Sequence, residues 1–76
     1  MDKPFRDRAG DELSIGDWVK FHRYLEDADF VGQVVAFNNK NRTLTIVSHG
    51  VLGWLYSSEV QKASNSEVAA WWLITT

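Results

Sequence analysis

Residues 13–60 read LSIGDWVKFHRYLEDADFVGQVVAFNNKNRTLTIVSHGVLGWLYSSEV, and this stretch decides the fold. Apolar and polar residues alternate in several short runs, the period expected of strands with one buried face. Turn residues separate the runs, and the Asn-rich segment 38–42 predicts a hairpin. Residues 57–60 suit the single 3₁₀ turn that often precedes a last short strand. We therefore predict an all-β fold, a closed five-stranded antiparallel barrel, for residues 13–63.

The run at residues 32–37 is apolar on both faces. Alternation places two sets of side chains on opposite faces, namely Gly32, Val34 and Ala36 against Gln33, Val35 and Phe37. A strand that is apolar on both faces is normally covered on both. We expect the outer cover to be the C-terminal segment or another subunit.

The two ends of the chain differ from this central stretch. Residues 1–12 are polar and unpatterned, which predicts a flexible arm. Residues 64–76 open with Ser64 followed three positions later by Glu67, the signature of a helix capping box. We expect a helix from Asn65 to Leu73 that packs on the barrel or on a partner. The alternative is a strand, because residues 71–76 read WWLITT and are rich in β-formers.

Composition narrows the class of protein. Seventy-six residues suit one domain, and the absence of Cys excludes disulfides and thiolate metal sites. Eight Lys and Arg against ten Asp and Glu give a formal net charge of −2, which argues against tight, sequence-blind nucleic-acid binding. The charged N-terminal residues do not resemble a signal peptide, and no long apolar run predicts a membrane span. We expect a cytoplasmic protein.

Three motifs within the central stretch carry a family resemblance. GDWV at 16–19, GQV at 32–34 and YSSEV at 56–60 resemble the small barrels of the Src-homology-3 (SH3) type, a group that includes KOW and Tudor modules. The resemblance implies an SH3-like barrel. It implies no single activity, because these motifs mark barrel geometry and recur in domains of unrelated function.

Within that group, residues 16–19 and 32–35 also resemble two segments of the type II dihydrofolate reductases, tetramers that bind folate and a nicotinamide cofactor in a central pore. A Val-Gln-Ile-Tyr quartet lines the pore of that family. The matching positions here read Gly53-Trp54-Leu55-Tyr56. An indole in place of the Gln amide removes the groups that hydrogen-bond pterin and nicotinamide.

Two groups of residues are candidates for binding a protein partner. The first is an acidic loop with an aromatic flank, made of Tyr24, Glu26, Asp27 and Asp29. In peptide-binding barrels of this shape such a loop captures Arg or Lys. The alternative is a solvated loop that keeps an edge strand soluble.

The second group is aromatic and comprises Trp54, Tyr56, Trp71 and Trp72. A domain of this size cannot easily hide four Trp side chains, and Trp is enriched at the energetic centres of interfaces. The alternative for Trp71 and Trp72 is that they seal the open end of the barrel.

A nucleic-acid site is a further alternative. The cations Lys20, Arg23, Lys40 and Arg42 would form a basic patch, with Trp18 or Phe37 as a platform on which a base stacks. Ordinary solvated charge explains the same residues.

Catalytic patterns are weak. His22 and His49 lie in different segments without acidic neighbours at metal-ligand spacing, and residues 57–59 lack a positioned base. We expect no metal and no cofactor.

The leading hypothesis is a non-enzymatic adaptor that binds a protein partner or itself as a homo-oligomer. Small modules of this kind are common on phages and mobile elements, an origin that size and resemblance imply. A KOW- or Tudor-like nucleic-acid-binding barrel is the first alternative, and a reductase-like pore enzyme is the second.

Overall fold

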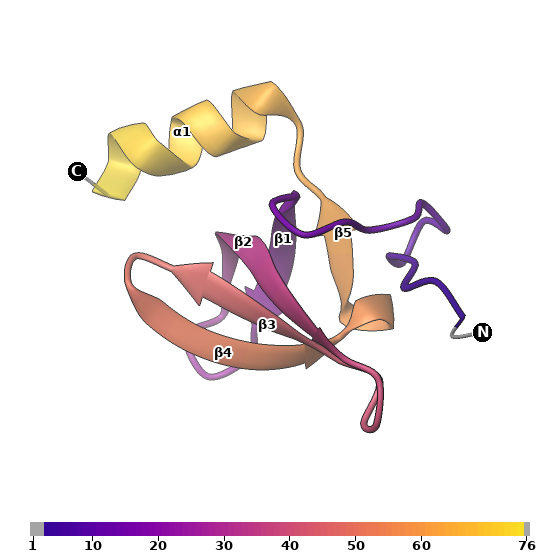
Figure 1. Ribbon diagram of the computed structural model, residues 1–76. Helices are drawn as coiled ribbons and strands as arrows, with labels where there is room; N and C mark the ends of the chain where they lie inside the picture. Colours follow the sequence, from indigo (N-terminus) through magenta and orange to yellow (C-terminus); the bar gives the residue numbers. More distant parts are fainter. Residues whose placement is uncertain (1–2, 76) are drawn as a thin grey trace.

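The computed structural model describes residues 3–75. Five antiparallel strands form one sheet in the order β4-β3-β2-β1-β5 (Figure 1). The elements are β1 (Trp18–Arg23), β2 (Ala28–Asn38), β3 (Thr43–Ser48), β4 (Val51–Tyr56), the 3₁₀ turn η1 (Ser57–Glu59), β5 (Val60–Lys62) and the helix α1 (Asn65–Thr75). The predicted five strands, the 3₁₀ turn and the C-terminal helix are confirmed.

The sheet is strongly curved but open. β4 and β5 are its two edges, and within residues 3–75 no strand pairing joins them. The chain passes from one edge to the other through η1, where the N–H of Tyr56 donates to the Glu59 carboxylate at 3.2 Å. The antiparallel sheet of the prediction is therefore present, and the closure of the barrel is not.

The core lies on the concave side of the sheet. Its most deeply buried side chains are at most 2% exposed and are Val19, Val34, Leu44, Ile46 and Val60. These branched side chains suit the pleated surface of a sheet. They come from β1, β2, β3 and β5, so β4 alone among the five strands contributes no fully buried residue.

The N-terminal segment differs from the flexible arm predicted for residues 1–12. Phe5 is 4% exposed and stacks on Phe37, with 4.6 Å between the ring centroids. The guanidinium of Arg42 lies 3.9 Å from the centroid of the Phe5 ring and donates to the two carbonyl oxygens that precede it. Residues 3–12 thus pack against the sheet and supply part of its core.

Asp7 attaches the same segment to β5. Its buried carboxylate accepts backbone N–H groups from Ala9, Asp11 and Lys62 at 2.8 to 3.0 Å. Burial by itself raises the pKa of Asp7, but these donors outweigh burial and hold that pKa below its ordinary value. The N–H of Arg8 also donates to the first carbonyl of β5 at 2.8 Å. The segment therefore covers the β5 edge (Figure 1).

A β-bulge corrects the predicted faces of β2. The register between β2 and β3 shifts between Val34 and Ala36, so Val35 is the extra residue. A bulge reverses the alternation beyond it. Phe37 consequently faces the core, as Val34 does. Val35 lies on the outer face and is 41% exposed.

The helix α1 begins at the predicted capping box. Ser64 Oγ accepts the N–H of Glu67 at 3.1 Å, and the Glu67 carboxylate accepts the N–H of Ser64 at 3.0 Å. The same carboxylate lies 2.7 Å from Lys20 Nζ, and this hydrogen bond holds the pKa of Glu67 below its ordinary value. Within residues 3–75 no helix is long and apolar enough to cross a membrane.

Candidate functional site: an apolar groove beside the open edge

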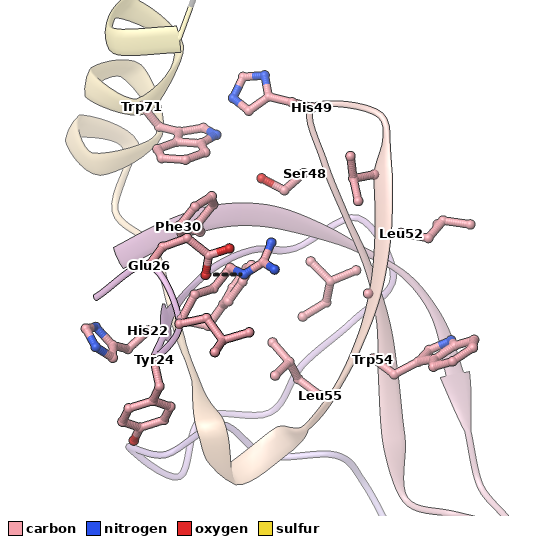
Figure 2. A pocket seen from close by; sticks show the side chains of 16 residues that line it. His22, Tyr24, Glu26, Phe30, Ser48, His49, Leu52, Trp54, Leu55 and Trp71 are labelled. Atoms are coloured by element: carbon pink, nitrogen blue, oxygen red, sulfur yellow. Dashed lines mark ion pairs between the residues drawn. The ribbon is translucent and has the colours of Figure 1, made fainter. Parts of the chain in front are cut away.

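A groove of about 770 Å³ opens on the concave side of the sheet, between β4, the β1–β2 loop and α1 (Figure 2). Its lining is mostly apolar. Its apolar lining includes Phe21, Phe30, Ile46, Val51, Leu55 and Trp71. The groove is therefore continuous with the hydrophobic core and open to solvent.

Gly53 explains why the groove is open along β4. The register pairs Ile46 with Gly53 and Leu44 with Leu55, so Gly53 and Leu55 face the side of the sheet that carries the core. A Cβ built on Gly53 would meet no atom within 4 Å. Opposite Ile46 the wall of the groove is therefore bare backbone.

Aromatic rings form the wall nearest α1. The ring centroid of Phe30 lies 6.1 Å from that of Phe21 and 5.2 Å from that of Trp71, and His49 lies 5.0 Å from Trp71. His49 and Gly50 both have positive φ, 51° and 78°, as the tight turn between β3 and β4 requires. Trp71 thus docks α1 onto β2 and onto this turn of its own chain.

The acidic loop adjoins that wall. Glu26 pairs with Arg23 at 3.2 Å, and the Arg23 guanidinium lies 5.1 Å from the centroid of the Phe30 ring. His22 contacts Asp29 at 3.0 Å and Asp27 at 3.4 Å. Of these three carboxylates only Glu26 lines the groove, where it pairs with Arg23. Asp27 and Asp29 lie beside the groove and give that neighbourhood its net negative charge.

The structure brings together half of the predicted partner-binding set. Tyr24, Glu26, Trp54 and Trp71 all border the groove. Figure 2 shows Trp54 and its neighbour Leu52 pointing outward from β4, away from the centre of the groove. Trp54 therefore lies on the outer face of the sheet at the border of the site.

The other predicted members lie outside the groove. Asp27 belongs to the β1–β2 loop beside it, and Asp29 is the second residue of β2. Tyr56 lies at the far end of β4, opposite Thr43. Trp72 lies on α1 with its ring centroid 6.0 Å from that of Trp18, and it is 44% exposed.

The predicted partner-binding set lacked most of the groove's lining, including Phe21, Phe30, His49 and Leu55. Phe21 and Phe30 are directly opposite in the β1–β2 register, and that register was the signal needed to find them. Alternation alone predicts a core position for Phe21 but does not say that the core is open there.

The predicted basic residues do not form one patch. Lys20 pairs with Glu67, Arg23 pairs with Glu26, and Arg42 lies over a ring of the N-terminal segment. Arg23 is level with the first residue of β2, whereas Lys40 lies in the turn after its last residue. The two ends of an 11-residue strand are about 30 Å apart along the chain, so these cations act separately.

The β4 edge beside the groove is exposed and apolar. Val51, Leu52, Trp54 and Tyr56 are 55 to 78% exposed, and the six residues of β4 include no charge. Among the described residues no group of three or more His, Asp or Glu side chains is placed to hold a metal ion. Comparison of the chain with protein-family models, with curated proteins and with solved structures finds no match.

Proposed function

We propose that this chain is a non-enzymatic adaptor module of SH3-like barrel architecture whose groove binds an extended segment of a protein partner. The segment carries an apolar anchor residue with Arg or Lys beside it. The strand order β4-β3-β2-β1-β5, with a 3₁₀ turn between the last two strands, supports this architecture. A place among the small accessory modules of mobile elements is part of the same proposal.

The single observation that carries the proposal is a groove that is apolar inside and lies beside the acidic side chains of Glu26, Asp27 and Asp29. A volume of about 770 Å³ falls in the range of about 300 to 1,000 Å³ that is common for binding pockets. The rings of Phe21 and Phe30 and the side chain of Leu55 offer contacts to an apolar anchor. The carboxylates of the β1–β2 loop favour a basic neighbour through charge complementarity.

The polar groups of the groove support binding over catalysis. Ser48 and His49 are the adjacent hydroxyl and imidazole in the lining. Ser48 Oγ donates to the carbonyl oxygen of Val31 at 2.8 Å, and the His49 ring packs against Trp71. A nucleophile needs its hydroxyl proton within reach of a base, and this hydroxyl is committed to the main chain.

The test is a nuclear magnetic resonance titration with two short peptides. Both carry the same Leu and Phe anchors, one with flanking arginines and the other with flanking glutamates. We expect the arginine peptide to shift the resonances of Phe21, Phe30 and Leu55 with a Kd below about 1 mM, and the glutamate peptide to bind at least tenfold more weakly.

Matched variants locate the charge effect. Asp27→Asn removes a carboxylate from the loop beside the groove, where the side chain is 95% exposed. We expect it to weaken binding of the arginine peptide. Asp11→Asn removes one exposed carboxylate from the N-terminal segment and is the control. Equal binding of the two peptides, or shifts that avoid the groove, would refute the proposal.

A further inference from the structure

The open edge of the sheet lacks the devices that normally keep an edge strand from pairing. Natural edge strands carry charges, Pro or a bulge, or are covered by another segment. β4 reads VLGWLY, without charge or Pro, and pairs with β3 in an unbroken register from Val51 to Tyr56. Four of its side chains are more than half exposed. An edge of this kind is a template for another strand.

We propose that β4 pairs antiparallel with the β4 strand of a second copy of this chain, about a two-fold axis at Gly53. Gly53 then lies opposite the partner's Gly53, and one continuous sheet runs through both copies. This interface goes beyond the proposed function, because its hydrogen bonds are made by the backbone edge of β4. Two of its side chains, Val51 and Leu55, also line the groove.

The sequence of β4 is self-complementary in this register. Leu52 lies opposite the partner's Trp54, and Val51 lies opposite the partner's Leu55. Each of these pairs occurs twice, so Val51, Leu52, Trp54 and Leu55 each meet an apolar partner, whereas Tyr56 lies opposite the partner's Gly50. β4 carries no charge, so no like charges oppose each other across the two-fold axis.

The neighbouring register, with its axis at Trp54, is less favourable. It places Leu52 opposite the partner's Tyr56. The N–H of Tyr56 already donates to the Glu59 carboxylate at 3.2 Å, so it is not available to extend the ladder. An axis at Gly53 also brings the two backbones together where neither copy has a Cβ. The structure leaves open space at that position.

The size of the interface predicts a weak dimer. Complete burial of the exposed parts of Val51, Leu52, Trp54 and Tyr56 would remove on the order of 1,000 Å² from solvent over both copies. Specific, stable interfaces bury about 1,200 to 2,000 Å². We therefore expect a reversible dimer with a Kd between about 10 µM and about 1 mM. The two-fold axis of an antiparallel pair is perpendicular to the sheet, so both grooves lie on the same side of the joined sheet.

Single-cysteine cross-linking tests the register directly, because the chain contains no Cys. Gly53→Cys places two thiols opposite each other at the axis, where strand geometry brings Cα atoms to about 4.5 to 5.5 Å, within disulfide range. In Leu52→Cys the two thiols are offset by two residues, so their Cα atoms are beyond the range of a disulfide. Asn41→Cys, in the exposed β2–β3 turn, reports random collision.

We expect Gly53→Cys to form covalent dimers at least tenfold faster than either control under mild oxidation. Equal rates for Gly53→Cys and Asn41→Cys would overturn the proposal. So would faster cross-linking of Leu52→Cys, or of Trp54→Cys, than of Gly53→Cys.

Sedimentation equilibrium of the chain without added Cys is the second measurement. Wild-type protein is expected to pass from monomer to dimer as its concentration rises to about 1 mM. Leu52→Lys puts a charge on the edge and is expected to remain monomeric. Val35→Lys changes an exposed outer-face residue of β2 and should leave the equilibrium unchanged. A wild type that stays monomeric, or that forms species larger than a dimer, would overturn the two-fold pairing.

The dimer and the groove are separable. Leu52 lies at the border of the groove, but its side chain points away from the groove's centre (Figure 2), so Leu52→Lys should lose the dimer and keep a Kd for the arginine peptide of the same order as wild type. Loss of the dimer with intact peptide binding supports both proposals. Loss of peptide binding by Leu52→Lys would place dimerisation and peptide binding at one site and would overturn the independence of the β4 interface.

Discussion

The two edges of this sheet are built in opposite ways. β5 has only three residues, begins with a fully buried Val60, and is covered by the N-terminal segment through Asp7 and the N–H of Arg8. β4 has six residues, of which Val51, Leu52, Trp54 and Tyr56 are more than half exposed. One edge is closed by the chain itself, and the other is left open.

The difference between the two edges indicates which residues stabilise the fold and which are available for interaction. A chain this short has a thin core, so each buried side chain carries a large share of the free energy of folding. In this protein that burial is concentrated at the covered edge and the central strands. Large apolar side chains on β4 add little to the core and create the surface that both proposals use. Variants at the two edges should therefore behave very differently.

The largest expected loss of stability comes from a substitution in the N-terminal segment that covers the β5 edge. Phe5→Ala removes a ring that is 4% exposed and stacked on Phe37, so we expect the free energy of unfolding to fall by about 3 to 5 kcal/mol. Urea unfolding followed by fluorescence measures it. Ile15→Ala, at a side chain that is 56% exposed, should cost less than about 1 kcal/mol. Equal costs would mean that residues 3–12 do not contribute to the core in solution.

A smaller effect comes from Asp7, which attaches the N-terminal segment to β5. We expect Asp7→Asn to lower the free energy of unfolding by about 1 to 2 kcal/mol at pH 7, because the carboxylate accepts three backbone N–H groups. The measurement is urea unfolding of wild type and variant from pH 7 to pH 2.

The lowered pKa of Asp7 determines how the stability difference changes with pH. The pKa of Asp7 is lowered in the folded state, so its stabilising effect is complete above the unfolded pKa of about 3.9 and is lost as the pH falls through the folded value. The difference in free energy of unfolding between wild type and Asp7→Asn should therefore disappear below about pH 4. A difference in free energy of unfolding that stays constant down to pH 2 would show that the charge of Asp7 does not contribute to stability.

The sequence was informative wherever structure depends on local residues. The strands, the turn at residues 38–42, the 3₁₀ turn and the capping box of Ser64 and Glu67 all depend on residues near one another in the chain. The bulge at Val35 was missed, because several apolar residues in a row fit a regular strand equally well. The role of Phe5 was missed because one aromatic residue in a polar segment has no periodicity.

The candidate site was predicted only in part for a related reason. Tyr24, Glu26, Trp54 and Trp71 stood out by residue type alone and do border the groove. The wall of the groove along β4 depends on register. Gly53 leaves this wall open because Gly53 lies opposite Ile46. Pairing between strands is a long-range property, and a single sequence without relatives does not specify it.

The smallest expected effect sharpens the contrast between the edges. Trp54 has one of the largest side chains of the protein and is 78% exposed, so folding removes little of its surface from water. We expect Trp54→Ala to change the free energy of unfolding by less than about 0.5 kcal/mol, measured at a protein concentration low enough to keep the chain monomeric. The same variant should weaken the dimer, because it removes both contacts with Leu52 across the axis. A loss of several kcal/mol from the monomer would mean that Trp54 is buried in solution, and the β4 edge would then belong to the covered part of the fold.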